Sequence, residues 1–286
     1  MSPLLTRKPM NRSVTSLPFY KVDAFTSQLF GGNPAAVILM ETFADDGLLR
    51  QIAAENNVPE TAFLVPDGDN YRLRWFTPTV EVPLCGHATL ASAAVVMERL
   101  QPGRTTVTFD SASGPLSVRR MGDRYVMNFP VRVPRSIPLP ARLTEALGIE
   151  PVETLDDGFN YIAVLQDMEA VCGLAPDIAA IARLDRPGVV VTARGDQRWD
   201  CVSRYFAPAK GIPEDPVTGG AHCGLAPYWS ARLGKSELRA FQASPRGGEL
   251  TCRLVGDRVE LEGACVFYLE GKVAVPVDQD AERGYR

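Results

Sequence analysis

Two related stretches decide the fold: Glu81-Val82-Pro83-Leu84-Cys85-Gly86-His87-Ala88-Thr89 and Glu214-Asp215-Pro216-Val217-Thr218-Gly219-Gly220-Ala221-His222. They hold the only two histidines of the chain. Each follows a strand-like segment that ends in proline, Arg74-Trp75-Phe76-Thr77-Pro78 in the first half and Arg204-Tyr205-Phe206-Ala207-Pro208 in the second. A strand and a Gly-rich entry into a helix therefore occur once in each half. This repetition predicts a duplicated domain, with one functional site built from two related loops between the halves.

The segment that follows each Gly-rich loop is predicted to be a buried helix. The first runs from about Ala88 to Leu100 and the second from about Ala221 to Leu233. Both carry apolar residues on nearly every side, which is typical of a helix in the middle of a domain. The flanking segments alternate apolar and polar residues, as strands do. Each half is therefore expected to be mostly strands around one central helix.

These patterns predict an α+β protein with two related domains, each made mostly of strands around one buried helix. A Pro-rich segment at 130–140 places the boundary between residues 17–133 and 134–286, with return of the last strand to the first domain left open. Residues 1–16 are polar and basic and are predicted to be a disordered tail. We also expect a helix at 45–56, a turn at 31–34 and separate strands at 258–262, 265–269 and 272–275.

Composition excludes several classes of function. The chain has 286 residues, 45% of them hydrophobic, and a net charge of −4, which is ordinary for a globular protein. It has no basic patch for nucleic acid or a membrane surface, and no apolar run long enough to span a bilayer. The first residues lack the apolar core of a secretory signal. The six cysteines are scattered, as free thiols are in cytosolic proteins, so we expect a cytoplasmic location.

The two Gly-rich loops are candidate anion sites. A loop that opens a helix presents unpaired backbone N–H groups at the positive end of the helix dipole, where carboxylates and phosphates bind. Cys85-Gly86-His87 and Thr218-Gly219-Gly220 would supply two such sites facing one cleft. The alternative is that each glycine only allows a tight turn into the helix.

Three side chains near the loops could move protons. Glu60 precedes an apolar strand, where partial burial would raise its pKa and suit it to moving a proton, but taken alone it is more typical of a solvated turn residue. Asp215 could add a second carboxylate, or only cap the turn before Pro216. His87 could exchange a proton near pH 7 or play a structural part. His222 is expected to pack inside its helix.

Other chemistries fit the residues less well. Cys85, His87, His222 and Cys223 do not match a recognised zinc spacing, so no metal is expected. Cys85 and His87 are only two residues apart, an awkward arrangement for a cysteine nucleophile and its base. The segment 31–34 lacks the Gly-Lys-Ser/Thr of a nucleotide loop.

Taken together, the motifs resemble the PhzF family of phenazine-biosynthesis-like isomerases, within the broader diaminopimelate-epimerase fold. They follow the family's order over nearly the whole chain after residue 17. The matching segments are Asp23-Ala24-Phe25, Gly32-Asn33-Pro34-Ala35-Ala36-Val37, Pro59-Glu60-Thr61-Ala62-Phe63, Arg74-Trp75-Phe76-Thr77-Pro78, Glu81-Val82-Pro83-Leu84-Cys85-Gly86-His87-Ala88-Thr89 and Glu214-Asp215-Pro216-Val217-Thr218-Gly219.

The resemblance implies two pseudo-symmetric domains, each a β-barrel-like sheet wrapped around its central helix. It also implies an interdomain active site, no metal or organic cofactor, and a homodimer. It implies that Glu60 is the acid/base that takes a proton from carbon and returns one elsewhere, assisted by His87 and Asp215. It also implies that the loop residues bind a small carboxylate substrate. The residues expected to bind substrate are Cys85, Gly86, Thr218, Gly219 and Gly220.

Two differences from related proteins restrict which substrates this protein could use. Relatives that racemise amino acids use one cysteine per loop, whereas Thr218 stands opposite Cys85, so one face of a carbon would lack a thiolate base. Gly220 replaces a serine that is frequent in the family, which puts the phenazine precursor in doubt. Two hypotheses follow: a proton-moving isomerase, or a non-catalytic member that binds a small ligand or a protein. Retention of Glu60, His87 and Asp215 together favours the enzyme.

Overall fold

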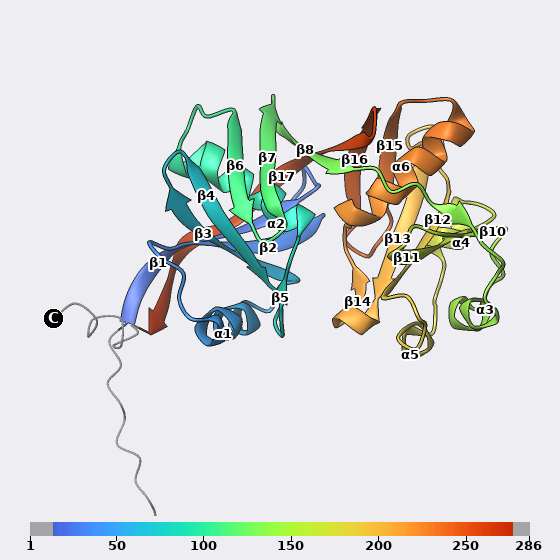
Figure 1. The fold of residues 1–286 in the computed structure, drawn as a ribbon, viewed down its shortest axis with the longest axis horizontal. Helices are drawn as coiled ribbons and strands as arrows, with labels where there is room; N and C mark the ends of the chain where they lie inside the picture. Colours follow the sequence, from blue (N-terminus) through green and yellow to red (C-terminus); the bar gives the residue numbers. More distant parts are fainter. Residues whose placement is uncertain (1–13, 277–286) are drawn as a thin grey trace, which may run out of the picture.

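The computed structural model describes residues 14–276 and shows two halves side by side (Figure 1). The first half runs from the N-terminal strand to β8 and holds one long central helix. Its elements are β1 (Val14–Ala24), β2 (Asn33–Leu39), α1 (Asp46–Asn56), β3 (Glu60–Asp67), β4 (Asn70–Phe76), β5 (Glu81–Val82), α2 (Gly86–Val95), η1 (Val96–Leu100), β6 (Thr106–Ser111), β7 (Gly114–Met121) and β8 (Arg124–Pro130).

The second half repeats this plan with additional short helices on its outer side. Among the described residues, no helix is long and apolar enough to cross a membrane. The elements are β9 (Arg135–Ser136), α3 (Ala141–Leu147), β10 (Glu153–Asp156), β11 (Asn160–Val164), α4 (Met168–Cys172), α5 (Ile178–Ile181), β12 (Gly188–Arg194), β13 (Cys201–Ala207), η2 (Pro208–Lys210), β14 (Ile212–Asp215), α6 (Gly219–Leu233), β15 (Glu237–Gln242), β16 (Gly248–Val255) and β17 (Arg258–Pro276).

Strand pairing confirms the predicted repeat. In the first half β2 pairs parallel with β3, and β4 pairs parallel with β6 and antiparallel with β5. In the second half β11 pairs parallel with β12, and β13 pairs parallel with β15 and antiparallel with β14. The two unusual parallel pairings thus occur at the same places in both halves. The two halves therefore share one topology.

The first sheet closes into a barrel of eight strands. Its ladder runs β1–β2–β3–β4–β6–β7–β8–β17 and returns to β1. Strand β17 joins the two sheets, because its first part pairs with β16 and β8 and its last part pairs with β1. This strand is continuous, so the three separate strands predicted at the C-terminal end were wrong in detail.

The two central helices form the core, as their all-round apolar character predicts. Every residue of α2 from His87 to Val95 is buried, and so is most of α6. Side chains of both helices belong to one continuous cluster that extends through both halves. The predicted helix at 88–100 does not stay α-helical throughout, since residues Val96–Leu100 wind as the wider π-helix η1.

Several boundaries differ from the prediction. Residues 14–16, expected to belong to a disordered tail, begin β1, because Val14 pairs with Pro276 of β17. Residues 1–13 of that predicted tail lie outside the described part. The predicted turn at 31–34 ends at Gly32, since Asn33 and Pro34 already belong to β2. The helix predicted at 45–56 is α1, with Asp45 as its N-cap.

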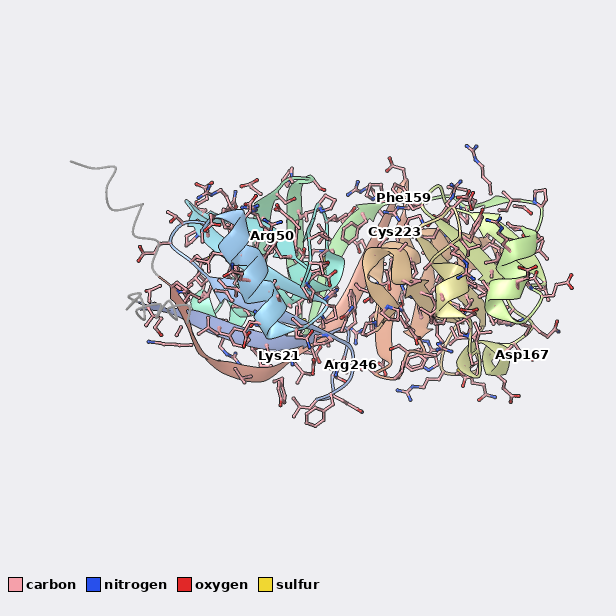
Figure 2. The ribbon with its side chains drawn as sticks, turned by 90° about the horizontal axis from the view of Figure 1, so that it is seen from below. Lys21, Arg50, Phe159, Asp167, Cys223 and Arg246 are labelled. Carbon is pink, nitrogen blue, oxygen red and sulfur yellow. The ribbon has the colours of Figure 1, made fainter. Side chains whose placement is uncertain are left out.

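Arg246 of the second half binds residues of the first half (Figure 2). From the turn between β15 and β16 it reaches the first half, where Nη2 lies 2.8 Å from Asp23 Oδ1 and donates to the Gly31 carbonyl. Its Nε donates to the Gly32 carbonyl. Gly32 has a φ of +62°, and an added Cβ would lie 2.2 Å from the Ala24 carbonyl oxygen. The backbone there must be glycine to place its carbonyl toward the arginine.

Replacing Arg246 with Met is expected to lower the free energy of unfolding by about 1–3 kcal/mol, because the buried carboxylate of Asp23 would lose its cationic partner. Urea denaturation would measure this loss. Arg198→Met is the matched control, since Arg198 pairs with Glu249 at the surface and exposed pairs contribute about 0–1 kcal/mol. Equal losses in the two variants would show that the Arg246 contact does not hold the halves together.

Candidate functional site

Glu60, Cys85 and His87 come together at one end of the first barrel. Glu60 is the first residue of β3, and Cys85 is the N-cap of α2. His87 lies between them: its Nε2 is 3.3 Å from Glu60 Oε2, and its Nδ1 is 3.4 Å from Cys85 Sγ. All three side chains are buried. Apart from their mutual approach, Glu60 Oε2 and His87 Nε2 have no hydrogen-bond partner among the described residues.

The environment of Glu60 favours its neutral form. Burial raises the pKa of its carboxyl to about 8, and the negative charge of Asp215 adds to the effect. A hydrogen bond with Cys85 and the positive charge of Lys210 oppose the rise in pKa. A carboxyl that titrates near 8 can both give and accept a proton at neutral pH, which is the property of a general acid/base.

His87 and Cys85 are held neutral by the same burial. Loss of solvation lowers the pKa of His87 to about 3, so the imidazole carries no charge at neutral pH. Burial, together with the nearby charge of Glu60, raises the pKa of the Cys85 thiol well above its usual range. Cys85 is therefore a thiol rather than a thiolate, and it is a poor base.

The same three side chains could also offer donor atoms to a metal ion, because one such atom from each lies within 4.8 Å of the others. A thiolate ligand is disfavoured by the raised pKa of Cys85. His87 also presents Nδ1 to the thiol and Nε2 to the carboxyl, on different sides of its ring. We interpret the cluster as an arrangement for proton transfer.

Asp215 is tied to the first half by Asn33. The Asn33 amide donates from Nδ2 to Asp215 Oδ1 at 2.7 Å and to the Val217 carbonyl at 2.9 Å. The other carboxyl oxygen, Oδ2, accepts from the Thr218 hydroxyl at 2.5 Å. Gln242 fixes the backbone on both sides, since it donates to the Asp215 carbonyl and accepts from the Thr218 amide. The carboxyl is thus fixed in orientation.

Asp215 also has a shifted pKa. Burial raises the pKa of its carboxyl to about 6, and the hydrogen bonds from Thr218 and Asn33 oppose the rise. Asp215 is an acid with a lower pKa than Glu60, and its negative charge acts on Glu60 across the boundary between the halves. Two carboxyls whose surroundings separate their pKa values are typical of acid/base sites.

Both Gly-rich loops leave backbone amides available for a ligand. Neither Cys85 nor Thr218 caps its own helix with a side-chain hydrogen bond. Thr218 directs its hydroxyl to Asp215 instead, and only its own amide is taken by Gln242. The first-turn amides of Gly86, Gly219 and Gly220 therefore have no side-chain acceptor among the described residues, as an anion site requires.

The second half does not repeat the carboxyl of Glu60. Strand register places Glu60 opposite Ala35, and at the matching place in the second half Gly188 lies opposite Asn160. A Cβ on Gly188 would lie 2.3 Å from the Tyr205 hydroxyl, which fills this space and donates to Asn160 Oδ1. The pseudo-symmetric fold therefore has an asymmetric site.

Two residues that take part in the site, Asn33 and Gln242, were not predicted as site residues. Asn33 was assigned to a turn, although the Gly-Asn-Pro motif that contains it could have indicated it. Gln242 contacts the site from β15 and carries no local signal, and neither does Tyr205, which fills the counterpart position in the second half. His222 packs as expected: it is fully buried, and its Nδ1 lies 2.8 Å from the Thr218 carbonyl oxygen.

Comparison with known proteins agrees with this architecture. The profile of the phenazine biosynthesis-like protein family matches residues 22–271. An uncharacterized isomerase of Pseudomonas aeruginosa is 49% identical over 257 residues, which cover 90% of this chain and 98% of the relative. A crystal structure of a PhzF-family phenazine biosynthesis protein from Enterococcus faecalis has a TM-score of 0.88 and 44% identity, and the match covers 91% of this chain and 99% of that one.

More distant structures share only the fold. A hydroxyproline epimerase from Agrobacterium vitis is 12% identical, with a TM-score of 0.59, and the match covers 92% of this chain and 93% of the epimerase. The predicted α+β fold with two barrel-like halves, related to that of epimerases, is thereby confirmed.

Proposed function

The chain belongs to the phenazine biosynthesis-like protein family, and from this premise we propose that it is an isomerase that moves a proton on a small carboxylate substrate without a cofactor. The carboxyl of Glu60 is the acid/base. The observation that carries the proposal is its burial beside His87, with a pKa raised to about 8. The homodimer and the cytoplasmic location expected from the sequence stay predictions.

Catalysis begins with an ionised Glu60, which removes a proton from a carbon made acidic by a neighbouring carboxyl, imine or diene. The electron pair of the broken C–H bond moves into that neighbouring group. The amides of Gly86, Gly219 and Gly220 donate to the negative charge that develops there. The now neutral Glu60 then returns its proton to a second carbon that is conjugated with that group, and the displaced electron pair forms the new C–H bond there.

His87 and Asp215 assist in different ways. The neutral imidazole of His87 faces Glu60 and holds the carboxyl toward the substrate without adding a charge. Asp215, whose pKa of about 6 leaves it mostly ionised at neutral pH, keeps the pKa of Glu60 high by its negative charge. Because Thr218 has no thiol and Cys85 stays protonated, a two-thiol racemisation has no base on either face.

The test is a screen for deuterium incorporation. A panel of small carboxylates and amino acids is incubated with the protein in D₂O and followed by mass spectrometry and NMR. Incorporation at carbon by the wild-type protein, with product formation, supports the isomerase. If no metabolite exchanges but small carboxylates bind between the loops, the protein is a binding member of the family and the proposal fails.

A further inference from the structure

Arg132 has an unusually loosely bound guanidinium. It follows β8 in the segment that joins the halves. Its Nη1 lies 3.5 Å from the Gly220 carbonyl oxygen and 4.0 Å from Asp157 Oδ2, and its guanidinium stacks on the Phe159 ring at 4.2 Å. Among the described residues, these are the only hydrogen bond, ion pair and cation–π contact of its side chain. By comparison, Arg204 binds Glu214 at 2.7 Å.

The stacking partner of Arg132 also favours a ligand site. Phe159 is 55% exposed, an uncommon state for a large aromatic side chain. Figure 2 places Phe159 and Cys223 at the end of the second half that faces the first. Stacking holds the guanidinium plane in one orientation and leaves its N–H edge free to bind.

The absence of a side chain at Gly220 opens the space in front of Arg132. A Cβ at Gly220 would meet no atom within 4 Å except Arg132 Nη1, at 3.9 Å. A ligand that is bound by the Gly220 amide could therefore extend directly to the guanidinium. A serine at this position would place its hydroxyl in the same space.

The segment that carries Arg132 also contacts the first loop. A Cβ at Gly86 would lie 3.8 Å from Met127 Cε and 3.9 Å from Phe129 Cζ, and both residues belong to β8. The segment therefore places apolar side chains next to Gly86 and, a few residues later, the cation of Arg132 next to Gly220. A ligand along it would meet an apolar surface at one end and a positive charge at the other.

We propose that Arg132 is a specificity-determining residue that binds a second anionic group of the substrate. The substrate class is then a small molecule with two acidic groups: one carboxylate is held by the loop amides and the other by the guanidinium. This inference rests on the proposed function for the position of the first carboxylate. An anion supplies the bidentate, charge-assisted hydrogen bonds that no described residue gives to Arg132.

The test compares two acids of equal chain length, glutarate with two carboxylates and valerate with one. Isothermal titration calorimetry of the full chain is expected to show that glutarate binds about tenfold or more tightly, the effect of one charged hydrogen-bonded contact. Arg132→Gln should remove this preference and leave valerate binding unchanged. Arg132→Lys should restore part of it.

Arg198→Gln is the control, because Arg198 also stacks on an aromatic ring, that of Trp199, and its ion pair with Glu249 is exposed at the surface. It should leave both affinities unchanged. Equal binding of the two acids by the wild-type protein, no binding of glutarate, or a preference that survives in Arg132→Gln would overturn the assignment. Exchange of the substrate C–H proton does not enter this test, so its failure is distinct from failure of the proposed isomerisation.

Discussion

Replacing Glu60 with Gln is expected to slow exchange of the substrate C–H proton with D₂O by about 10²–10⁴-fold, the usual contribution of a general acid/base. Gln keeps the size and polarity of the side chain but cannot accept the proton. In the wild-type protein the rate should rise about tenfold per pH unit up to about pH 8 and then level, because only the ionised carboxyl removes a proton. Mass spectrometry of the recovered substrate measures the rate.

Glu249→Gln is the control for this experiment, because Glu249 pairs with Arg198 at the surface. It should exchange at the wild-type rate. A general base usually contributes far more than about threefold to the rate. If Glu60→Gln exchanges the proton within about threefold of the wild-type rate, Glu60 is not the base.

The same substitution is expected to stabilise the fold at alkaline pH. Below the unfolded pKa of 4.5, Glu60 is protonated in both states, so the two proteins should differ little. Between 4.5 and about 8 the unfolded chain ionises first and binds fewer protons, so wild-type stability falls as the pH rises. Gln has no such loss. Above about pH 8 the variant should be more stable by about 2–5 kcal/mol.

Urea denaturation at a series of pH values measures this difference in stability. A range from about pH 4 to about pH 9 includes the pKa of Glu60 in both the unfolded and the folded state. Glu249→Gln again serves as the control and should show no growing advantage with pH. A constant difference between Glu60→Gln and wild type across the range would mean that the folded protein accommodates the ionised carboxyl without cost.

Much of the fold could be predicted from local patterns. The central helices α2 and α6 are apolar on all sides, and that pattern has few explanations other than burial inside a sheet. The repeated Gly-rich loops indicated the two-fold plan. A half-buried Glu60 with a raised pKa was one of two alternatives at the start of its apolar strand, and burial is the main cause of its pKa shift in the structure.

The rest depended on contacts between distant residues. Asn33 and Asp215 are separated by 182 positions, so no local pattern indicates that one donates to the other. The Tyr205 hydroxyl occupies the position that corresponds to Glu60 only because β12 and β13 pair in one register. The continuity of β17 was missed because its pairing partners, β16, β8 and β1, come from both halves.

The pKa of Glu60 in the substrate-free protein tests the central claim most directly. It can be measured by NMR from the pH dependence of the ¹³C-labelled carboxyl signal, assigned as the resonance that is missing in Glu60→Gln. The account predicts a titration with its midpoint near 8, which shifts downward when Asp215→Asn removes the neighbouring negative charge. A midpoint near the ordinary value of 4.5 would contradict the assignment of Glu60 as the acid/base.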